Sequence, residues 1–257
     1  MNRNFYLSRP SALHALHPLT KLALVAAILL IGFLARSPHI PVAIFFFAIL
    51  PLAVWGKIAL RLTVVTATII LPFALSIFIV QGLFYPGASA DLFRLGPLAL
   101  KEQGLLFAYG TASRIFLLAG AGLLLLFSTH PADLMLALEE RGLPAPLGYI
   151  LVSAIQLLPQ MQVRAAAIRD AQSSRGLETA GSLLTRVRAM IPLISPLVFS
   201  ALGQLDERAM ALQARAFFVP QTKTSFKELR DTRAQNAARW VLVLGALALG
   251  IGEVWVG

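Results

Sequence analysis

Cysteine is absent from this chain of 257 residues, and charged residues are scarce. Without a thiol the protein can form no disulfide, no thiolate metal site and no cysteine nucleophile. Asp, Glu, Lys and Arg make up only 13% of the residues, about half of their share in an average soluble domain. Hydrophobic residues make up 58%, and the mean hydropathy is +0.76. A water-soluble fold could not cover its surface with so few polar side chains, so the composition predicts an integral membrane protein.

The hydrophobic runs are continuous, which predicts helical spans, because the strands of a membrane β-barrel alternate between apolar and polar residues. No small-residue cleavage site follows the basic N-terminal segment, so we interpret the first run as a span and not as a signal peptide. The sequence therefore predicts an all-α, polytopic membrane protein with about five transmembrane helices. The five candidate spans are 22–35, 40–56, 62–85, 103–128 and 240–257.

Positive charges fall on alternate connections between these runs. Lys and Arg outnumber Asp and Glu by 22 to 12, which gives a net charge of +10. Three cations precede the first run, and Lys57 and Arg61 separate the second from the third. Connections on the cytoplasmic side of a membrane are enriched in Lys and Arg. We therefore expect the N-terminus in the cytoplasm and the C-terminus outside.

The segment between the fourth and fifth runs differs from the rest of the chain. Residues 164–240 hold 12 of the 22 Lys and Arg residues. Two apolar runs lie nearby, but Pro159 ends one and two further prolines interrupt the other, so amphipathic helices in the cytoplasm are a better interpretation than two more spans. The expected organisation is a membrane domain with four spans (1–128), a cytoplasmic domain of long helices (129–235) and a C-terminal span (236–257).

Residue patterns for enzyme chemistry are missing. Gly56-Lys57 is the only Gly-Lys pair, and it lacks the other residues of a phosphate-binding loop. His14 and His17 lie three residues apart, but no third metal ligand accompanies them. No Ser, His and Asp set has a suggestive spacing. We therefore predict a protein that is not an enzyme, with no cofactor and no metal site, and the basic charge does not require a nucleic-acid partner.

Arg114 is the single charged residue within the fourth run. A charge inside a membrane costs several kcal/mol unless it is paired or reaches the surface. No carboxylate occupies a matching depth, so Gln81 or backbone carbonyl groups are the available partners. We expect a structural role for this arginine.

Two arginines are expected at the ends of long helices. Residues 165–176 are rich in small side chains, and Gly176 is a typical helix stop, which places Arg175 at the helix end. A second predicted helix, 204–218, carries Arg215 between two alanines near its end. One such arginine could simply complement the helix dipole. Two of them in one domain suggest a two-pronged contact with a dimeric acidic partner, because guanidinium groups pair bidentately with carboxylates.

With these features the chain resembles the transmembrane T component of energy-coupling factor (ECF) transporters, the EcfT/CbiQ/BioN family. The resemblance covers nearly the whole chain. Its motifs are His-Pro-Leu-Thr-Lys at 17–21, the segment that begins Thr-His-Pro-Ala-Asp at 129, and Leu-Leu-Pro at 157–159 followed by Ala-Gln-Ser-Ser-Arg-Gly at 171–176. The two Ala-Arg-Gly-type motifs of the family map onto Ser174, Arg175 and Gly176 and onto Ala214, Arg215 and Ala216, and each departs from the pattern at one flanking position.

The resemblance implies a subunit of an ECF-type ABC importer in the bacterial inner membrane. Such a subunit couples ATP hydrolysis by two cytoplasmic ABC ATPases, a homodimer or a heterodimer, to the reorientation of a substrate-binding S component. The cargo would be a vitamin or a metal ion. The two arginine motifs would contact the ATPases. One apolar flank would either contact the S component or pack within the chain, and it comprises Leu197, Leu202, Leu205, Met210 and Leu212.

Other transport functions are the alternatives. A stand-alone secondary transporter would place polar residues near the middle of several spans, whereas here only Arg114 is charged at such depth. A permease subunit of another ABC transporter is the nearest rival, but its usual single short coupling loop would not need two arginine-tipped helices. The sequence does not indicate the substrate.

Overall fold

The computed structural model describes residues 11–86, 91–95, 98–177, 182–219 and 229–255. They form two compact units, which we call the bundle unit (Met1–Ala137 with Leu229–Gly257) and the helix-pair unit (Leu138–Glu228). The described residues are almost entirely helical, which confirms the predicted all-α membrane fold.

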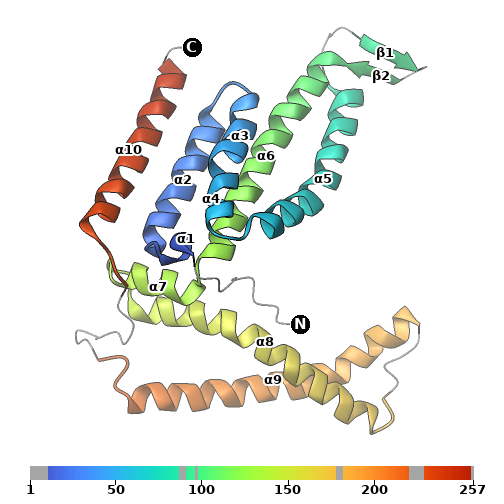
Figure 1. Cartoon of the computed structure of the whole chain (residues 1–257). Helices are drawn as coiled ribbons and strands as arrows, with labels where there is room; N and C mark the ends of the chain where they lie inside the picture. The colour runs from blue at the N-terminus through green and yellow to red at the C-terminus, as the bar shows by residue number, and fades with distance from the viewer. Residues whose placement is uncertain (1–10, 87–90, 96–97, 178–181, 220–228, 256–257) are drawn as a thin grey trace. The chain divides into compact units, whose positions relative to one another are not determined.

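The bundle unit contains the expected apolar runs as helices (Figure 1). A short π-helical segment joins two helices into one continuous stretch, and a small antiparallel hairpin occupies the connection between the third and fourth apolar runs. The elements are α1 (Ala12–Ala15), α2 (Pro18–Leu34), α3 (His39–Ile44), η1 (Phe45–Ile49), α4 (Leu50–Trp55), α5 (Ala59–Phe84), β1 (Asp91–Leu95), β2 (Leu98–Lys101), α6 (Glu102–Ser128) and α10 (Arg233–Trp255). Helix α7 (Pro131–Glu139) continues into the helix-pair unit.

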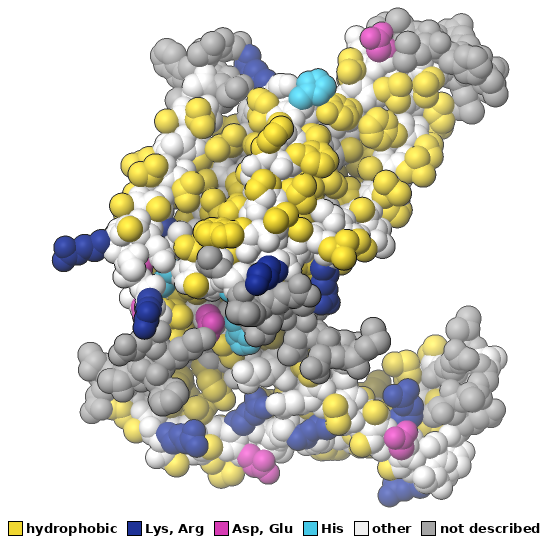
Figure 2. Space-filling model, viewed as in Figure 1, with side chains coloured by type: hydrophobic (Ala, Val, Ile, Leu, Met, Phe, Trp, Pro, Cys, Tyr) yellow, Lys and Arg dark blue, Asp and Glu magenta, His cyan; other side chains and the backbone are white. Residues whose placement is uncertain are grey.

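Three helices in the described part of the chain are long and apolar enough to cross a membrane, namely Ala59–Phe84, Glu102–Ser128 and Val187–Ala214. Pro18–Leu34 and His39–Trp55 are shorter apolar helices. Val187–Ala214 belongs to the segment that we expected in the cytoplasm, and by length and composition alone it could also cross. Hydrophobic side chains cover much of the bundle unit on the face seen in Figure 2, as lipid contact requires.

Helix α6 lies at the centre of the bundle unit and runs antiparallel to α2 and α5. Its small residues Gly104, Ala108 and Ala112 are buried, which lets the neighbouring backbones approach closely. A Cβ atom on Gly104 would collide with the carbonyl oxygen of Gln81 in α5. Further along, Gly120 leaves room for the buried ring of Phe45.

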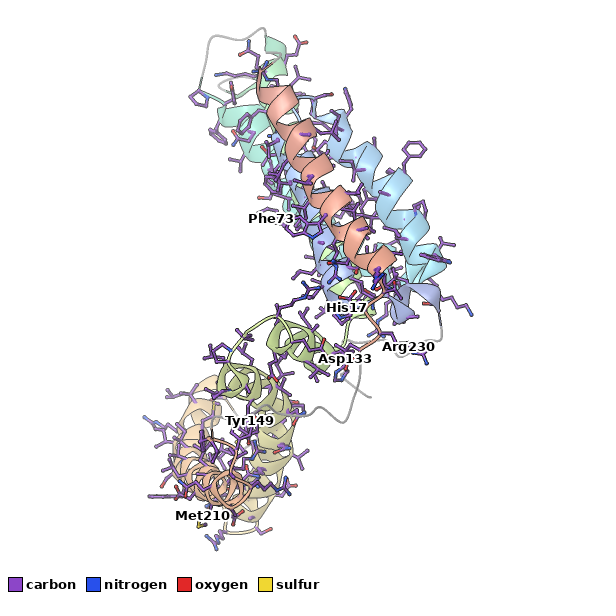
Figure 3. All side chains as sticks on the ribbon, turned by 90° about the vertical axis from the view of Figure 1, so that its left-hand side faces the viewer. His17, Phe73, Asp133, Tyr149, Met210 and Arg230 are labelled. Atoms are coloured by element: carbon purple, nitrogen blue, oxygen red, sulfur yellow. The ribbon has the colours of Figure 1, made fainter. Side chains whose placement is uncertain are left out.

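Helix α10 packs along α2 in the parallel direction. The backbone N–H of His17, at the start of α2, donates to Oε1 of Gln235 at 3.1 Å, and Gly250 lies against Leu34 at the other end. The two helices therefore begin on the same side of the bundle. Figure 3 shows His17 and Arg230 at this end.

Cations cap the carboxyl ends of three helices in the bundle unit. The Lys21 ammonium donates to the Ser128 carbonyl at the end of α6 (2.8 Å), and the Arg114 guanidinium donates to the Ala35 carbonyl at the end of α2 (3.1 Å). Lys101 donates to the Tyr85 carbonyl after α5 at 2.6 Å. Terminal carbonyls have no partner within their own helix, and the helix dipole favours positive charge there. The partner of Arg114 is therefore a backbone carbonyl, one of the two kinds of partner that the sequence left open.

The helix-pair unit consists of two long antiparallel helices that cross, α8 (Ala145–Ser173) and α9 (Leu183–Ala214) (Figure 1). Helix α8 continues through Pro159, where the apolar run ends, and α9 continues through Pro192 and Pro196. One expectation about these helices was wrong. Helix α9 ends at Ala214 and not at Phe218, because the backbone turns left-handed at Ala216.

Candidate functional site

Arg175 occupies the last position before a left-handed glycine. Gly176 has a φ of +90°, and its N–H donates to the Ser173 carbonyl at 3.0 Å. The N–H of Leu177 reaches back to the Gln172 carbonyl, also at 3.0 Å. This pair of bonds is the Schellman motif, which satisfies carbonyls at a helix end. The motif holds the backbone of Arg175 at the very tip of α8.

Arg215 occupies the same position at the tip of α9. Ala216 has a φ of +54°, and its N–H donates to the Gln213 carbonyl at 2.9 Å. The N–H of Phe217 donates to the Leu212 carbonyl at 3.0 Å. The two arginine motifs therefore share one backbone geometry, although one has glycine and the other alanine at the left-handed position.

Both tips are available to a partner. All six residues of the two motifs are exposed: Ser174, Arg175, Gly176, Ala214, Arg215 and Ala216. Within the described part of the chain, neither guanidinium has a hydrogen-bond or ion-pair partner. An exposed arginine without an intramolecular partner keeps its five N–H donors free for a carboxylate or a phosphate.

The two tips lie at opposite ends of the crossed helix pair. Arg164 of α8 contacts Ser200 of α9 near the crossing, whereas Tyr149, near the start of α8, packs against Phe217 just beyond Arg215 (ring centroids 5.4 Å apart). Arg175 is 11 residues beyond Arg164, or roughly 16 Å of helix. Arg215 is 15 residues beyond Ser200, or roughly 22 Å. The pair can therefore contact two separate positions on a partner.

A third arginine has the same backbone geometry, and the sequence analysis missed it. Arg141 precedes Gly142, whose φ is +104° and whose N–H donates to the Glu139 carbonyl at 3.0 Å. The N–H of Leu143 donates to the Leu138 carbonyl at 3.0 Å. The repeated tripeptide Arg-Gly-Leu, at 141–143 and at 175–177, is the signal that could have identified it.

The expected apolar flank of α9 divides into two groups. Leu202, Leu205 and Met210 are exposed, and Met210 points away from α8 in Figure 3. Leu197 and Leu212 are half-buried within the helix-pair unit. Only the first group is accessible to another protein or to lipid.

Exchanging the left-handed residues should change stability in opposite directions. A left-handed backbone strains alanine by about 1 kcal/mol relative to glycine. We therefore expect Ala216→Gly to stabilise the helix-pair unit by about 1 kcal/mol and Gly176→Ala to destabilise it by a similar amount. Among the described residues nothing lies within 4 Å of a Cβ atom at position 176, so the expected effect is conformational and not steric. Denaturant unfolding of the two variants in detergent measures both values, and changes of the same sign would contradict the assignment.

Comparison with known proteins gives a consistent result. The family model described as cobalt transport protein (CbiQ) matches residues 10–225. The energy-coupling factor transporter transmembrane protein EcfT of Thermosediminibacter oceani is 28% identical over 95% of this chain and 94% of its own length. The proteins of the same name from Ruminiclostridium cellulolyticum (29% identity over 89% of this chain and 88% of the relative) and Heliobacterium modesticaldum (35% over 56% and 57%) are also similar. The chain therefore belongs to the CbiQ family and is a transmembrane T component of the ECF transporter type.

Proposed function

We propose that this membrane protein couples ATP hydrolysis by two cytoplasmic ABC ATPase subunits to the reorientation of a substrate-binding S component. It would itself be non-catalytic and would reside in the bacterial inner membrane. The cargo would be a vitamin or a metal ion, since the family model is named for cobalt transport. The ATPases would form a homodimer or a heterodimer, and either fits two tips that share one geometry but differ in sequence.

The observation that carries the proposal is a pair of exposed arginines at opposite ends of two crossed helices, neither of which has a side-chain partner among the residues that the structure describes. Each ATPase subunit would present an acidic groove to one tip. Arg175 would enter the first groove together with Ser174 and Gly176, and Arg215 would enter the second together with Ala214 and Ala216. Two separated contacts suit a partner whose two grooves change their separation when ATP binds. The exposed flank of Leu202, Leu205 and Met210 would face the S component.

The proposal also assigns sides of the membrane. Residues 1–128 and 236–257 would lie in the membrane, and residues 129–235 would form the cytoplasmic coupling domain. The parallel packing of α10 on α2 supports this arrangement, because the two helices must then cross in the same direction. The N-terminus would lie in the cytoplasm and the C-terminus outside.

The test is co-purification in mild detergent of the tagged chain with the ABC ATPase subunits of the same organism. We expect the variant Arg175→Glu/Arg215→Glu to bind the ATPases more than about a hundredfold more weakly, because two charge-assisted contacts become repulsive. The control is Arg169→Glu/Arg188→Glu, which makes the same charge change at two exposed arginines outside the two motifs. Equal binding by both double variants, or no binding by the wild-type chain, would reject the coupling role.

A further inference from the structure

The crossing of α8 and α9 is held by polar side chains. One guanidinium nitrogen of Arg164 in α8 donates to the carbonyl oxygen of Ser200 in α9 at 3.2 Å and also contacts the hydroxyl of Ser200. A second bond runs in the other direction, from the Arg208 guanidinium of α9 to Oε1 of Gln160 in α8 at 3.1 Å. The two contacts connect about one turn of α8 with about two turns of α9.

Apolar packing contributes little to this crossing. Gly148 is the only buried residue in the described part of α8, and Ala189 is the only one in that of α9. Large side chains such as Leu158, Val163 and Phe199, which lie near the crossing, are more than half exposed. Helix pairs normally take their crossing angle from interdigitated apolar ridges. Here the directional bonds of Arg164 and Arg208 must define the angle instead.

The prolines divide each helix at the crossing. Pro159 precedes Gln160 and Arg164 in α8, and Pro196 precedes Ser200 in α9. Proline removes a backbone hydrogen bond and makes a helix easier to bend at that point. Beyond the crossing, both helices continue without proline as far as Arg175 and Arg215. We call the proline-free segments 164–175, at the end of α8, and 200–215, at the end of α9, the two arms. Each arm ends in an arginine tip, and the prolines that allow bending precede it in the chain.

We propose that Arg164, assisted by Arg208, is the positioning residue that fixes the pivot between the two arms and so sets the separation of the Arg175 and Arg215 tips. The inference rests on the proposed coupling function, because the separation of the tips matters only if both of them engage a partner. Arg164 itself touches neither partner. It acts by preventing the arms from rotating independently, so that a displacement of one tip is transmitted to the other.

The distance between the tips can be measured directly, because the chain has no native cysteine. Spin labels at Ser173→Cys and Gln213→Cys, both exposed positions close to the tips, would lie roughly 30–35 Å apart along the two arms. Double electron–electron resonance on the full-length chain in nanodiscs then gives the distribution of separations. We expect Arg164→Met to broaden this distribution about twofold, since a hinge that loses its directional contacts samples more angles. Arg164→Lys, which keeps a donor and the charge, should restore most of the wild-type width.

The matched control is Arg169→Met, which removes an exposed arginine from the same arm and should leave the distribution unchanged. If Arg164→Met does not fold, Ser200→Ala combined with Arg208→Met removes two of the contacts from the other helix and should broaden the distribution in the same way. A wild-type distribution in the folded Arg164→Met or Ser200→Ala/Arg208→Met variant would overturn the proposal. Equal broadening in Arg169→Met would also overturn it.

Two further measurements, co-purification with the ATPases and substrate uptake, test this inference separately from the coupling function. If both hold, Arg164→Met should still co-purify with the ATPases through its intact tips, while substrate uptake by the assembled transporter falls about tenfold, as loss of coupling between sites predicts. If the tips do not bind ATPases at all, the wild-type chain fails to co-purify, whereas the spin-label result is unaffected. Unchanged uptake by an Arg164→Met complex with a broadened distribution would show that the pivot does not serve coupling, and would overturn the proposed role.

Discussion

Replacing Lys21 with methionine is expected to lower the free energy of unfolding of the bundle unit by about 2–4 kcal/mol. Lys21 is only 4% exposed, and its ammonium group donates to the carbonyls of Ser128 and His14 at 2.8 and 3.2 Å. Methionine fills a similar volume but donates no hydrogen bond, so both carbonyls lose a partner. Because one of them ends α6, the favourable interaction with the helix dipole is lost as well. Chemical unfolding in mixed detergent micelles measures the difference.

The control for Lys21 is Arg36→Met, which removes an exposed cation from the same unit. It should change the free energy of unfolding by no more than about 0.5 kcal/mol, as is usual for surface positions. A loss of similar size in both variants would mean that net charge, and not the capping of α6, determines the effect. An unchanged stability of Lys21→Met would show that water replaces the ammonium group.

The positions of the helices in the bundle unit could be predicted from the sequence, because each run is apolar and bounded by polar or proline residues. The start of α2 was predicted less accurately, because the helix begins at Pro18 whereas the apolar run begins only after Lys21. Proline is favoured in the first turn, and His17 accepts a hydrogen bond from the backbone N–H of Leu19. The sequence did not predict Lys21 within the helix, because a buried lysine is favourable there only with the carbonyl partners that other elements supply.

The partner of Arg114 illustrates what a sequence leaves open. The sequence limits the partners of Arg114 to Gln81 or backbone carbonyls. Which of these it contacts depends on how α2 and α6 align. The contacts of Lys21 with Ser128 and of Arg114 with Ala35 fit one antiparallel register, in which α2 ends beside the middle of α6. That register results from the packing of Gly32 against Leu117, which no pattern within either helix reveals.

The ends of α8 and α9 also differ in how well the sequence predicts them. Gly176 is a recognisable stop signal, so the end of α8 was predicted close to its actual position at Ser173. Alanine rarely adopts a left-handed backbone, so the sequence predicted the end of α9 at Phe218 rather than before Ala216. The contacts of Arg164 and Arg208 join residues 36 and 48 positions apart, and they follow only from the crossing itself.

Replacing Asp231 with alanine is expected to destabilise the attachment of α10 by about 2–4 kcal/mol. The Arg239 guanidinium donates to both carboxylate oxygens of Asp231, at 2.6 and 2.5 Å. The side chain of Arg239 is 10% exposed and that of Asp231 is 26% exposed, so the pair is shielded only in part and the expected value lies toward the low end for buried pairs. Alanine at position 231 would leave the cation of Arg239 inside the bundle unit without its carboxylate.

The double variant Asp231→Ala/Arg239→Met separates the two possible causes of this loss. If the cost comes from an unpaired buried charge, removing Arg239 as well should recover most of the stability, because methionine packs in the space without requiring a partner. The coupling energy from the four unfolding measurements, wild type included, should then exceed about 1 kcal/mol. Additive losses would mean that Asp231 acts through another contact of the segment that leads into α10.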